Sequence, residues 1–279
     1  MSRVAVVTDS TSYLPEGLAE ASGLTVVPLH VVLGGVTGQE NVDITPADVA
    51  AALRERRINV TTSRPTPTEL VTAYRSTGAT QIVSVHLSAH LSGTLDSARL
   101  AGQAVAEEGI EVRVVDSRSI GMGLGFAAVA AAEAAAAGGD LDAVEAAAAG
   151  VRTATLFYVD TFEHLRRGGR LTAASALVGA ALGVKPLLHV VGGEIVLLEK
   201  VRTFSRAIAK LISVAVETAG EDPVEVVVHH LEAPERAAQL VDDLRAALPN
   251  AASLRVSEIG AAVGAHVGPG CLAVVLWRR

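Results

Sequence analysis

The sequence predicts an α/β protein of two domains, in which a parallel sheet with helices on both faces precedes an α/β domain with a mixed sheet. Three observations predict this fold class. Runs of β-branched residues alternate with helical segments through the first half of the chain. The second half contains a hairpin pattern, which a purely parallel sheet lacks. Finally, 279 residues with 50% hydrophobic content can bury the core of one large or two modest domains.

The first expected domain, residues 1–155, repeats strand, turn and helix. Its expected strands are "RVAVVTDS", "LTVVPLHVVLGG" as one or two strands, "QIVSVHL" and "EVRVVDS". Its expected helices are "LPEGLAEASG", "TPADVAAALRERR" with Thr45 as N-cap, a segment from about Thr68 to Thr77, one from Ser92 to about Glu108, and alanine-rich segments at 122–137 and 141–149. Ligands of such sheets bind at the carboxyl ends of the strands, which here read "TDSTS", "HLSAHLSG" and "VVDSRS".

The second expected domain, residues 156–279, has a different pattern, which begins at about residue 155 with the strand "TLFYVD". Helices are expected over "TFEHLRRGG" and "TAASALVGAALG". The segment "LLHVVGGEIVLLEK" predicts a hairpin with Gly192-Gly193 as its turn. There follow a helix from about Phe204, the strand "EVVVHHL", the helix "PERAAQLVDDLRAAL", the strand "LRVSEI", the short segment "GAAVGAHVG" and the strand "CLAVVLW". The strands of this half predict a mixed sheet.

Composition excludes several classes of protein. The net charge of −7, from 23 Lys and Arg against 30 Asp and Glu, disfavours a nucleic-acid surface. The single cysteine, Cys271, allows no internal disulfide and no cysteine zinc cluster, which fits a reducing compartment. No metal is assigned, because the histidines lack ligand spacing. No segment predicts a secretion signal or membrane span, so we expect a soluble, cytoplasmic protein.

Two hydroxyl-rich segments are candidate binding sites. In "HLSGTLD", Ser92, Gly93 and Thr94 stand where a strand gives way to a helix, so free N–H groups at the helix start could bind an anion. Alternatively, Ser92 only caps its own helix. In "VTTSRPTP", Thr62 and Ser63 are expected in a loop stiffened by Pro65 and Pro67, where capping is again the alternative to ligand contact.

A histidine and several arginines complete the candidate set. His266 in "GAHVGPG" lies between glycines and could bind a carboxylate or act as a base, or it could be a structural histidine. Arg170 in "HLRRGGRL" and Arg202 in "EKVRTFSR" are either solvated or part of a docking surface for an anionic group or partner.

Several of these motifs together resemble the DegV family. They are "VTDSTSYLP", "TTSRPTP", "HLSAHLSGTLDSA", "VVDSRSIGMGLG", "FEHLRRGGRL", "GVKPLLHVVGGEI", "EKVRT" and "GAHVGPG", in the family's order and from end to end of the chain. The resemblance implies a two-domain fold with a long-chain fatty acid between the domains. It also implies a non-catalytic subunit of a bacterial fatty acid kinase, which presents the carboxylate to a separate ATP-binding subunit for acyl-phosphate formation.

The resemblance also implies roles for particular residues. Thr62, Ser92 and His266 would bind the carboxylate, with support from Ser63, Gly93 and Thr94, and Arg170 and Arg202 would contact the kinase subunit. The bound fatty acid would be a ligand, with no cofactor, and transient contact with a membrane is compatible with this role. Two positions depart from the family pattern: Arg64 replaces a more usual glutamine, and Val267 a threonine.

Two other functions stay open from the sequence. In a serine hydrolase acting on acyl esters, Ser92 would be the nucleophile, His266 the base, and Asp9 or Asp116 the orienting acid, although no G-x-S-x-G motif is present. In a domain that binds phosphate or a sugar phosphate, the helix start at Ser92 would hold the phosphate.

Overall fold

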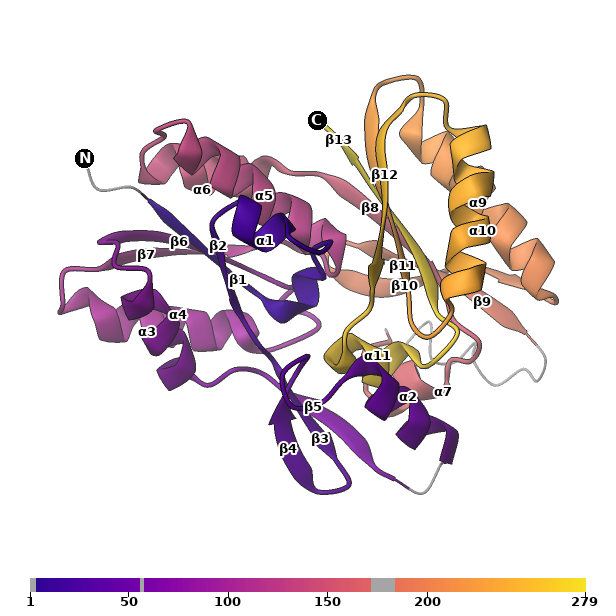
Figure 1. The fold of residues 1–279 in the computed structure, drawn as a ribbon, viewed down its shortest axis with the longest axis horizontal. Coiled ribbons are helices and arrows are strands. Elements are labelled where there is room, and N and C mark those ends of the chain that lie inside the picture. Colours follow the sequence, from indigo (N-terminus) through magenta and orange to yellow (C-terminus); the bar gives the residue numbers. More distant parts are fainter. Residues whose placement is uncertain (1–3, 56–57, 172–183) are drawn as a thin grey trace.

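The computed structural model describes residues 4–55, 58–171 and 184–279 and contains the predicted α/β fold. Two large sheets lie in two lobes, and a small third sheet lies beneath them with α2 and α11 (Figure 1). The N-terminal sheet is parallel and the C-terminal sheet is mixed, as the sequence predicts.

The N-terminal sheet has four parallel strands in the order β2-β1-β6-β7. Helices cover both of its faces, because alternate residues of the buried strands are apolar on each side: Val7 and Ile82 pack with α3 and α4, and Val6 and Val83 with α5 and α6. The elements are β1 (Ala5–Asp9), β2 (Leu24–Val27), β6 (Gln81–His86), β7 (Glu111–Asp116), α1 (Leu18–Ala21), α3 (Pro67–Ser76), α4 (Thr94–Ala106), α5 (Met122–Ala136) and α6 (Leu141–Gly150).

The C-terminal sheet has six strands in the order β10-β9-β8-β13-β11-β12, of which only the β11–β12 pair is parallel. Helices α9 and α10 cover one face through a cluster that includes Leu211, Leu240 and Val274. The elements are β8 (Thr153–Tyr158), α7 (Glu163–Arg167), β9 (Lys185–Val191), β10 (Glu194–Val201), α9 (Phe204–Ala219), β11 (Val224–His230), α10 (Pro234–Ala247), β12 (Ala251–Glu258), α11 (Ala261–Val267) and β13 (Leu272–Arg278).

Helix α5 lies between the two large sheets and joins their cores. Leu124 and Ala131 pack with residues of the parallel sheet, whereas Met122 and Phe126 pack against Trp277 and its neighbours in the mixed sheet. Its alanines and glycines are small, so both sheets can approach the helix closely. The absence of polar side chains from residues 122–132 therefore reflects burial between two layers of structure, whereas Glu133 near the end of α5 is exposed.

The third sheet was not predicted and positions part of the pocket described below. Its three antiparallel strands, in the order β4-β3-β5, are β3 (His30–Leu33), β4 (Val36–Gln39) and β5 (Val60–Ser63), and α2 (Pro46–Glu55) connects the last two. Thr62 is therefore on a strand, paired with Val31, and the prediction that it lies in a loop is wrong. These strands are short and rich in threonine and glycine, which weakens their alternation pattern.

Most helix ends lie within about two residues of the positions that local sequence motifs predict. Thr45 accepts a hydrogen bond from the Asp48 N–H at 3.2 Å and so caps α2 as expected. Helix α4 begins at Thr94 with Gly93 as N-cap, so the expected start at Ser92 is two residues early. The helix expected over 172–183 lies outside the described residues. None of the helices in the described ranges has both the length and the apolar character needed to span a membrane.

The position of the domain boundary stays a prediction. Strand β8 begins at Thr153 and pairs only within the mixed sheet, whereas α6 ends at Gly150 against the parallel sheet. A boundary after residue 155 would fall inside β8.

The β9–β10 hairpin turn ties the C-terminal sheet to the N-terminal lobe. Gly192 and Gly193 have φ of 61° and 96°, as the predicted two-residue turn requires. The Ser88 hydroxyl donates a hydrogen bond of 2.8 Å to the Gly193 carbonyl. A Cβ on Gly193 would overlap the Ser88 Oγ, whereas a Cβ on Gly192 would have open space.

This contact predicts different effects for two matched substitutions. Gly192→Ala should lower the free energy of unfolding by about 1 kcal/mol, because alanine is strained at positive φ. Gly193→Ala should lower it by about 2–3 kcal/mol, because it adds a steric clash and disturbs the bond to Ser88. Urea denaturation of the two variants measures the difference. Equal losses would show that the hairpin tip does not contribute to joining the lobes.

Candidate functional site

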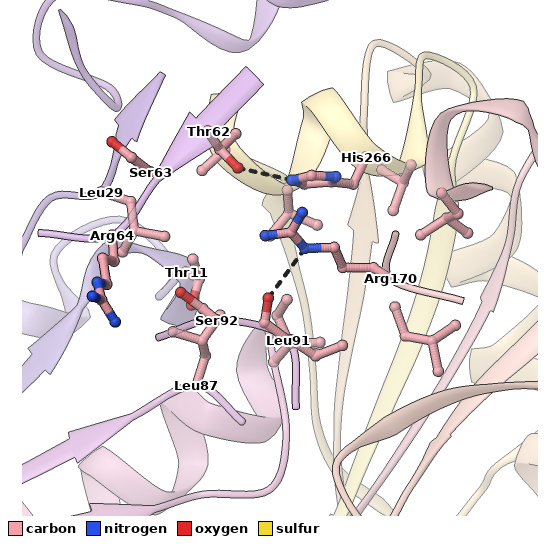
Figure 2. A pocket seen from close by; sticks show the side chains of 16 residues that line it. Thr11, Leu29, Thr62, Ser63, Arg64, Leu87, Leu91, Ser92, Arg170 and His266 are labelled. Carbon is pink, nitrogen blue, oxygen red and sulfur yellow. Dashed lines mark hydrogen bonds between the residues drawn. The ribbon is translucent and has the colours of Figure 1, made fainter. Parts of the chain in front are cut away.

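A pocket of about 530 Å³, part of it open to solvent, lies where the small sheet, α11 and the ends of β1 and β6 meet. Its wall includes polar groups from segments far apart in the chain, as Figure 2 shows. The polar lining residues are Thr11, Thr62, Ser63, Arg64, Ser92, Arg170 and His266, and the apolar ones include Leu29, Leu87, Leu91, Leu165 and Ala262.

Thr62 and His266 form the central polar contact of this pocket. The Thr62 Oγ1 lies 2.8 Å from the His266 Nε2 (Figure 2). Strand β5 supplies the threonine and the last turn of α11 supplies the histidine, 204 residues apart in sequence. The structure thus brings together two of the three residues expected to bind a carboxylate.

His266 is neutral at ordinary pH. Burial, and secondarily the nearby charge of Arg170, lowers the pKa of His266 to about 4. Its Nδ1 is buried and has no hydrogen-bond partner within the described residues. A neutral imidazole leaves its bare nitrogen unpaired at less cost than an N–H, so the proton belongs on Nε2. His266 then donates to Thr62, and the Thr62 hydroxyl is free to donate into the pocket.

Arg170 brings a positive charge into the same pocket. Its side chain extends between the Thr62–His266 pair and Leu91 (Figure 2), where Nε donates to the Leu91 carbonyl at 3.2 Å and Nη1 donates to the Gly168 carbonyl. Both acceptors are neutral, and the described part of the chain offers Arg170 no carboxylate partner. Sequence reasoning gave Arg170 only a partner-docking role and missed its place in the pocket wall.

Ser92 lies on the opposite wall of the pocket from His266, and Gly93 and Thr94 follow it outside the pocket lining. The Ser92 hydroxyl is 2.9 Å from the Thr94 Oγ1 and accepts a longer bond, 3.3 Å, from the Thr94 N–H. Thr94 is fully buried, so it supports Ser92 and does not itself line the pocket. The Gly93 carbonyl accepts a 3.1 Å hydrogen bond from Arg64, which therefore bridges the pocket mouth.

Three other expected residues have simpler positions. Ser63 lines the pocket rim as an exposed residue beside Thr62. Arg202 is exposed after β10 and does not line the pocket. Val267 lines the apolar side of the pocket, where a threonine would have placed a further hydroxyl.

A second, apolar pocket of about 440 Å³ continues from the first. The two pockets share Ile120, Ile195, Val263 and Val267, and the second is also lined by Tyr13, Phe157, Ile259, Cys271 and Ala273. His229, also in its wall, accepts from the Met122 N–H at 2.9 Å and donates to the Ser257 carbonyl at 3.2 Å. Both ring nitrogens are thus satisfied by backbone, so they leave the pocket effectively apolar.

Thr11 in the pocket wall is held by a buried polar network that sequence reasoning missed. Its hydroxyl donates to Asp9 at 2.5 Å, and Asp9 also accepts from the Leu87 N–H and contacts the His86 Nδ1 at 3.0 Å. The His86 Nε2 contacts Ser84 at 2.7 Å. The alternation of Ser84 and His86 along a buried strand was the available signal.

The structure does not bring together the Ser-His-Asp arrangement that the hydrolase hypothesis requires. Asp9 binds His86, and Asp116 accepts from the backbone N–H groups of Arg118 and Ala89. Neither carboxylate orients His266, whose Nδ1 is unpartnered in the described chain. Within the same described residues, no group of three His, Cys, Asp or Glu side chains could hold a metal ion.

The fold and the pocket define a class: two-domain α/β proteins with an apolar pocket that continues from a pocket lined by hydroxyl, imidazole and guanidinium groups. The model of the family described as "Uncharacterised protein, DegV family" matches residues 3–279. A DegV domain-containing protein of Streptomyces coelicolor is 54% identical over 287 residues, covering 100% of both chains. The chain belongs to the DegV family.

Solved structures of similar chains have the same fold. A fatty-acid-binding DegV family protein of Thermus thermophilus superposes with a TM-score of 0.90 at 31% identity, covering 99% of this chain and 100% of its own. DegV of Bacillus subtilis, a fatty acid binding protein, gives a TM-score of 0.90 at 32% identity with full coverage of both chains. Family membership and the two-domain fold are therefore confirmed, and these DegV neighbours bind fatty acids.

The burial of His266 predicts a specific titration. Its imidazole should stay neutral, with the proton on Nε2, until the pH approaches about 4. His229 should also stay neutral, because burial lowers its pKa to about 4, but with its proton on Nδ1. Long-range ¹H–¹⁵N NMR spectra of the histidine rings across pH 3.5–8 report tautomer and pKa. A His266 signal that titrates near 6.5 would contradict the buried, neutral state.

The same shift has a defined sign for stability. The unfolded chain binds a proton at His266 as pH falls through about 6.5, and the folded protein does so only near 4, so acidification over this interval favours unfolding. Replacing His266 by Gln should therefore reduce the loss of stability between pH 6.5 and 4, by on the order of 2 kcal/mol.

Proposed function

We propose that this protein binds a long-chain fatty acid, with the carboxylate among Thr62, Ser92, His266 and Arg170 and the tail in the apolar pocket. The observation that carries the proposal is the continuity of the two pockets through Ile120, Ile195, Val263 and Val267. A ligand that fills both must have an anionic end and a long apolar body. The fatty-acid-binding DegV structures at above 30% identity support the same ligand class.

The two parts of the ligand contribute differently to binding. Each methylene removed from water contributes about 0.8 kcal/mol, so roughly fourteen contribute on the order of 11 kcal/mol before ordering costs. The carboxylate, by contrast, must keep hydrogen-bond donors to avoid a desolvation penalty. The free Thr62 hydroxyl, the Ser92 hydroxyl and the Arg170 guanidinium supply them.

We further propose that the bound carboxylate is presented to a separate ATP-dependent kinase subunit. A carboxylate oxygen would attack the γ-phosphorus of ATP, forming the acyl–oxygen–phosphorus bond of an acyl phosphate and releasing ADP. This chain would supply ligand binding and orientation, and the partner would supply the nucleotide site. The partly open pocket, which Arg170 lines, and the exposure of Arg202 support this role, with Arg170 near the carboxylate and Arg202 as a docking residue.

Two measurements test the ligand proposal. Mass spectrometry of an organic extract of purified protein should find a long-chain fatty acid, and delipidated protein should rebind it. Thr62→Val keeps the side-chain shape but removes the donor to the carboxylate, so fatty acid affinity should fall roughly 10- to 100-fold. Thr61→Val, on the neighbouring exposed position of β5, is the matched control and should retain affinity. Protein that neither carries nor rebinds a fatty acid contradicts the proposal.

The kinase proposal is tested through Arg202. Arg202→Ala should bind fatty acid as the wild type does, because the residue is outside the pocket, but should lower acyl-phosphate formation at least roughly 10-fold in the presence of ATP and a kinase subunit. Arg245→Ala, an exposed arginine of α10, is the control. Hydroxylamine trapping of the acyl phosphate measures the product. Equal rates for Arg202→Ala and the control would exclude a docking role for Arg202.

A further inference from the structure

Glu40, which follows β4, is a buried carboxylate without a cation partner in the described chain. It is 1% exposed and accepts hydrogen bonds from the Ser10 hydroxyl, from the Tyr13 hydroxyl at 2.8 Å and from the Ala262 N–H at 2.7 Å. Burial raises the pKa of Glu40, and these hydrogen bonds oppose the rise. A carboxyl group buried at such cost needs these donors, so it fixes the segments that carry them.

The Ala262 contact places Glu40 at the start of α11. The N-cap of this helix, Gly260, has no side chain to bind the free N–H groups of the first turn. Glu40 binds the Ala262 N–H, and the Tyr13 hydroxyl accepts from the Val263 N–H at 3.1 Å. A Cβ on Gly260 would overlap the Glu40 carboxylate, so glycine leaves room for this cap.

Helix α11 is short, so the position of its start determines the position of its end. It spans Ala261–Val267, and His266 lies four residues after Ala262 on the same helix face. The apolar side of α11 presents Ala261, Ala262 and Ala265 to Val31 and Val49. On the other side of α11, Val263 and Val267 pack into the core cluster shared by the two lobes. These apolar contacts are non-directional, whereas the hydrogen bonds at the two ends, to Glu40 at the start and to Thr62 near the end, require a particular axial position.

We infer that Glu40 is a positioning residue, which acts through α11 to hold the His266 Nε2 within hydrogen-bond distance of the Thr62 Oγ1. It does not line the pocket around Thr62 and His266. Its contribution is to keep the imidazole N–H aimed at the threonine, which leaves the Thr62 hydroxyl proton free for the ligand head group. Tyr13 assists, because its hydroxyl contacts both Glu40 and the helix start.

The first test needs no ligand. In ring ¹H–¹⁵N spectra, Glu40→Ala should move the His266 resonances and raise the His266 pKa by on the order of 1 unit, because a displaced α11 exposes the ring. Glu40→Gln should restore most of the wild-type spectrum, since its amide oxygen still accepts from Ala262. Asp140→Ala removes the N-cap of α6, away from the pocket, and should leave His266 unchanged. A Glu40→Ala protein that loses stability but keeps the wild-type His266 spectrum overturns the inference.

Tyr13→Phe covers the case in which Glu40→Ala fails to fold. It keeps the ring packing and removes only the hydroxyl, so it should shift His266 less than Glu40→Ala but measurably. An unchanged His266 spectrum in this variant also overturns the inference.

The second readout, fatty acid binding, rests on the proposed function. Affinity of delipidated protein for oleate should fall roughly 5- to 20-fold in Glu40→Ala and stay unchanged in Asp140→Ala. If wild-type protein does not bind oleate at all, the proposed function fails while the histidine spectrum still decides the role of Glu40. If wild type binds and Glu40→Ala binds equally well, the positioning role is excluded.

Discussion

The architecture depends on one constraint: residues 122–132 of α5 must be apolar on every side, because this part of the helix packs against both large sheets at once. Leu124 and Ala131 contact the parallel sheet, while Met122 and Phe126 contact the mixed sheet. A larger residue would separate the lobes and a polar one would be buried without a partner. At the start of α5, Ile120 and Gly121 line the apolar pocket. This pocket thus lies where the helix joins the two layers.

The chemistry of the pocket depends on burial and on neutral groups. Burial lowers the pKa of His266 and so keeps its imidazole neutral. With its proton on Nε2, the imidazole donates to the Thr62 hydroxyl, which can then donate its own proton into the pocket. Within the described residues, Arg170 is bound only to carbonyl oxygens, so its positive charge is not neutralised by an internal ion pair. The pocket wall therefore combines a hydroxyl held by a neutral imidazole with a cation held by carbonyl groups.

The sequence predicted features that local physical chemistry determines. Gly192-Gly193 forms the hairpin turn because positive φ favours glycine, and Thr45 caps α2 because its hydroxyl is the local acceptor. The family resemblance implied that Thr62 and His266 share a site, but other features that depend on distant segments were missed. The small sheet forms because β5 pairs with β3, from which α2 separates it in sequence. Arg170 lies in the pocket because of the course that the chain takes after α7. Asp9 gave no sign that it binds His86 and holds Thr11, because that network closes only when β1 and β6 pair. Which residues lie near the strand ends was therefore predictable, but which atoms meet was not.

The distance along the chain between Thr62 and His266 has a consequence for biosynthesis. Because 204 residues separate the two partners, the binding site is among the last parts of the molecule to form, after α11 has left the ribosome and β13 has inserted between β8 and β11. An incomplete nascent chain already contains Thr62, Ser92 and Arg170 but lacks His266. The Thr62–His266 contact therefore closes only after the C-terminal elements have folded.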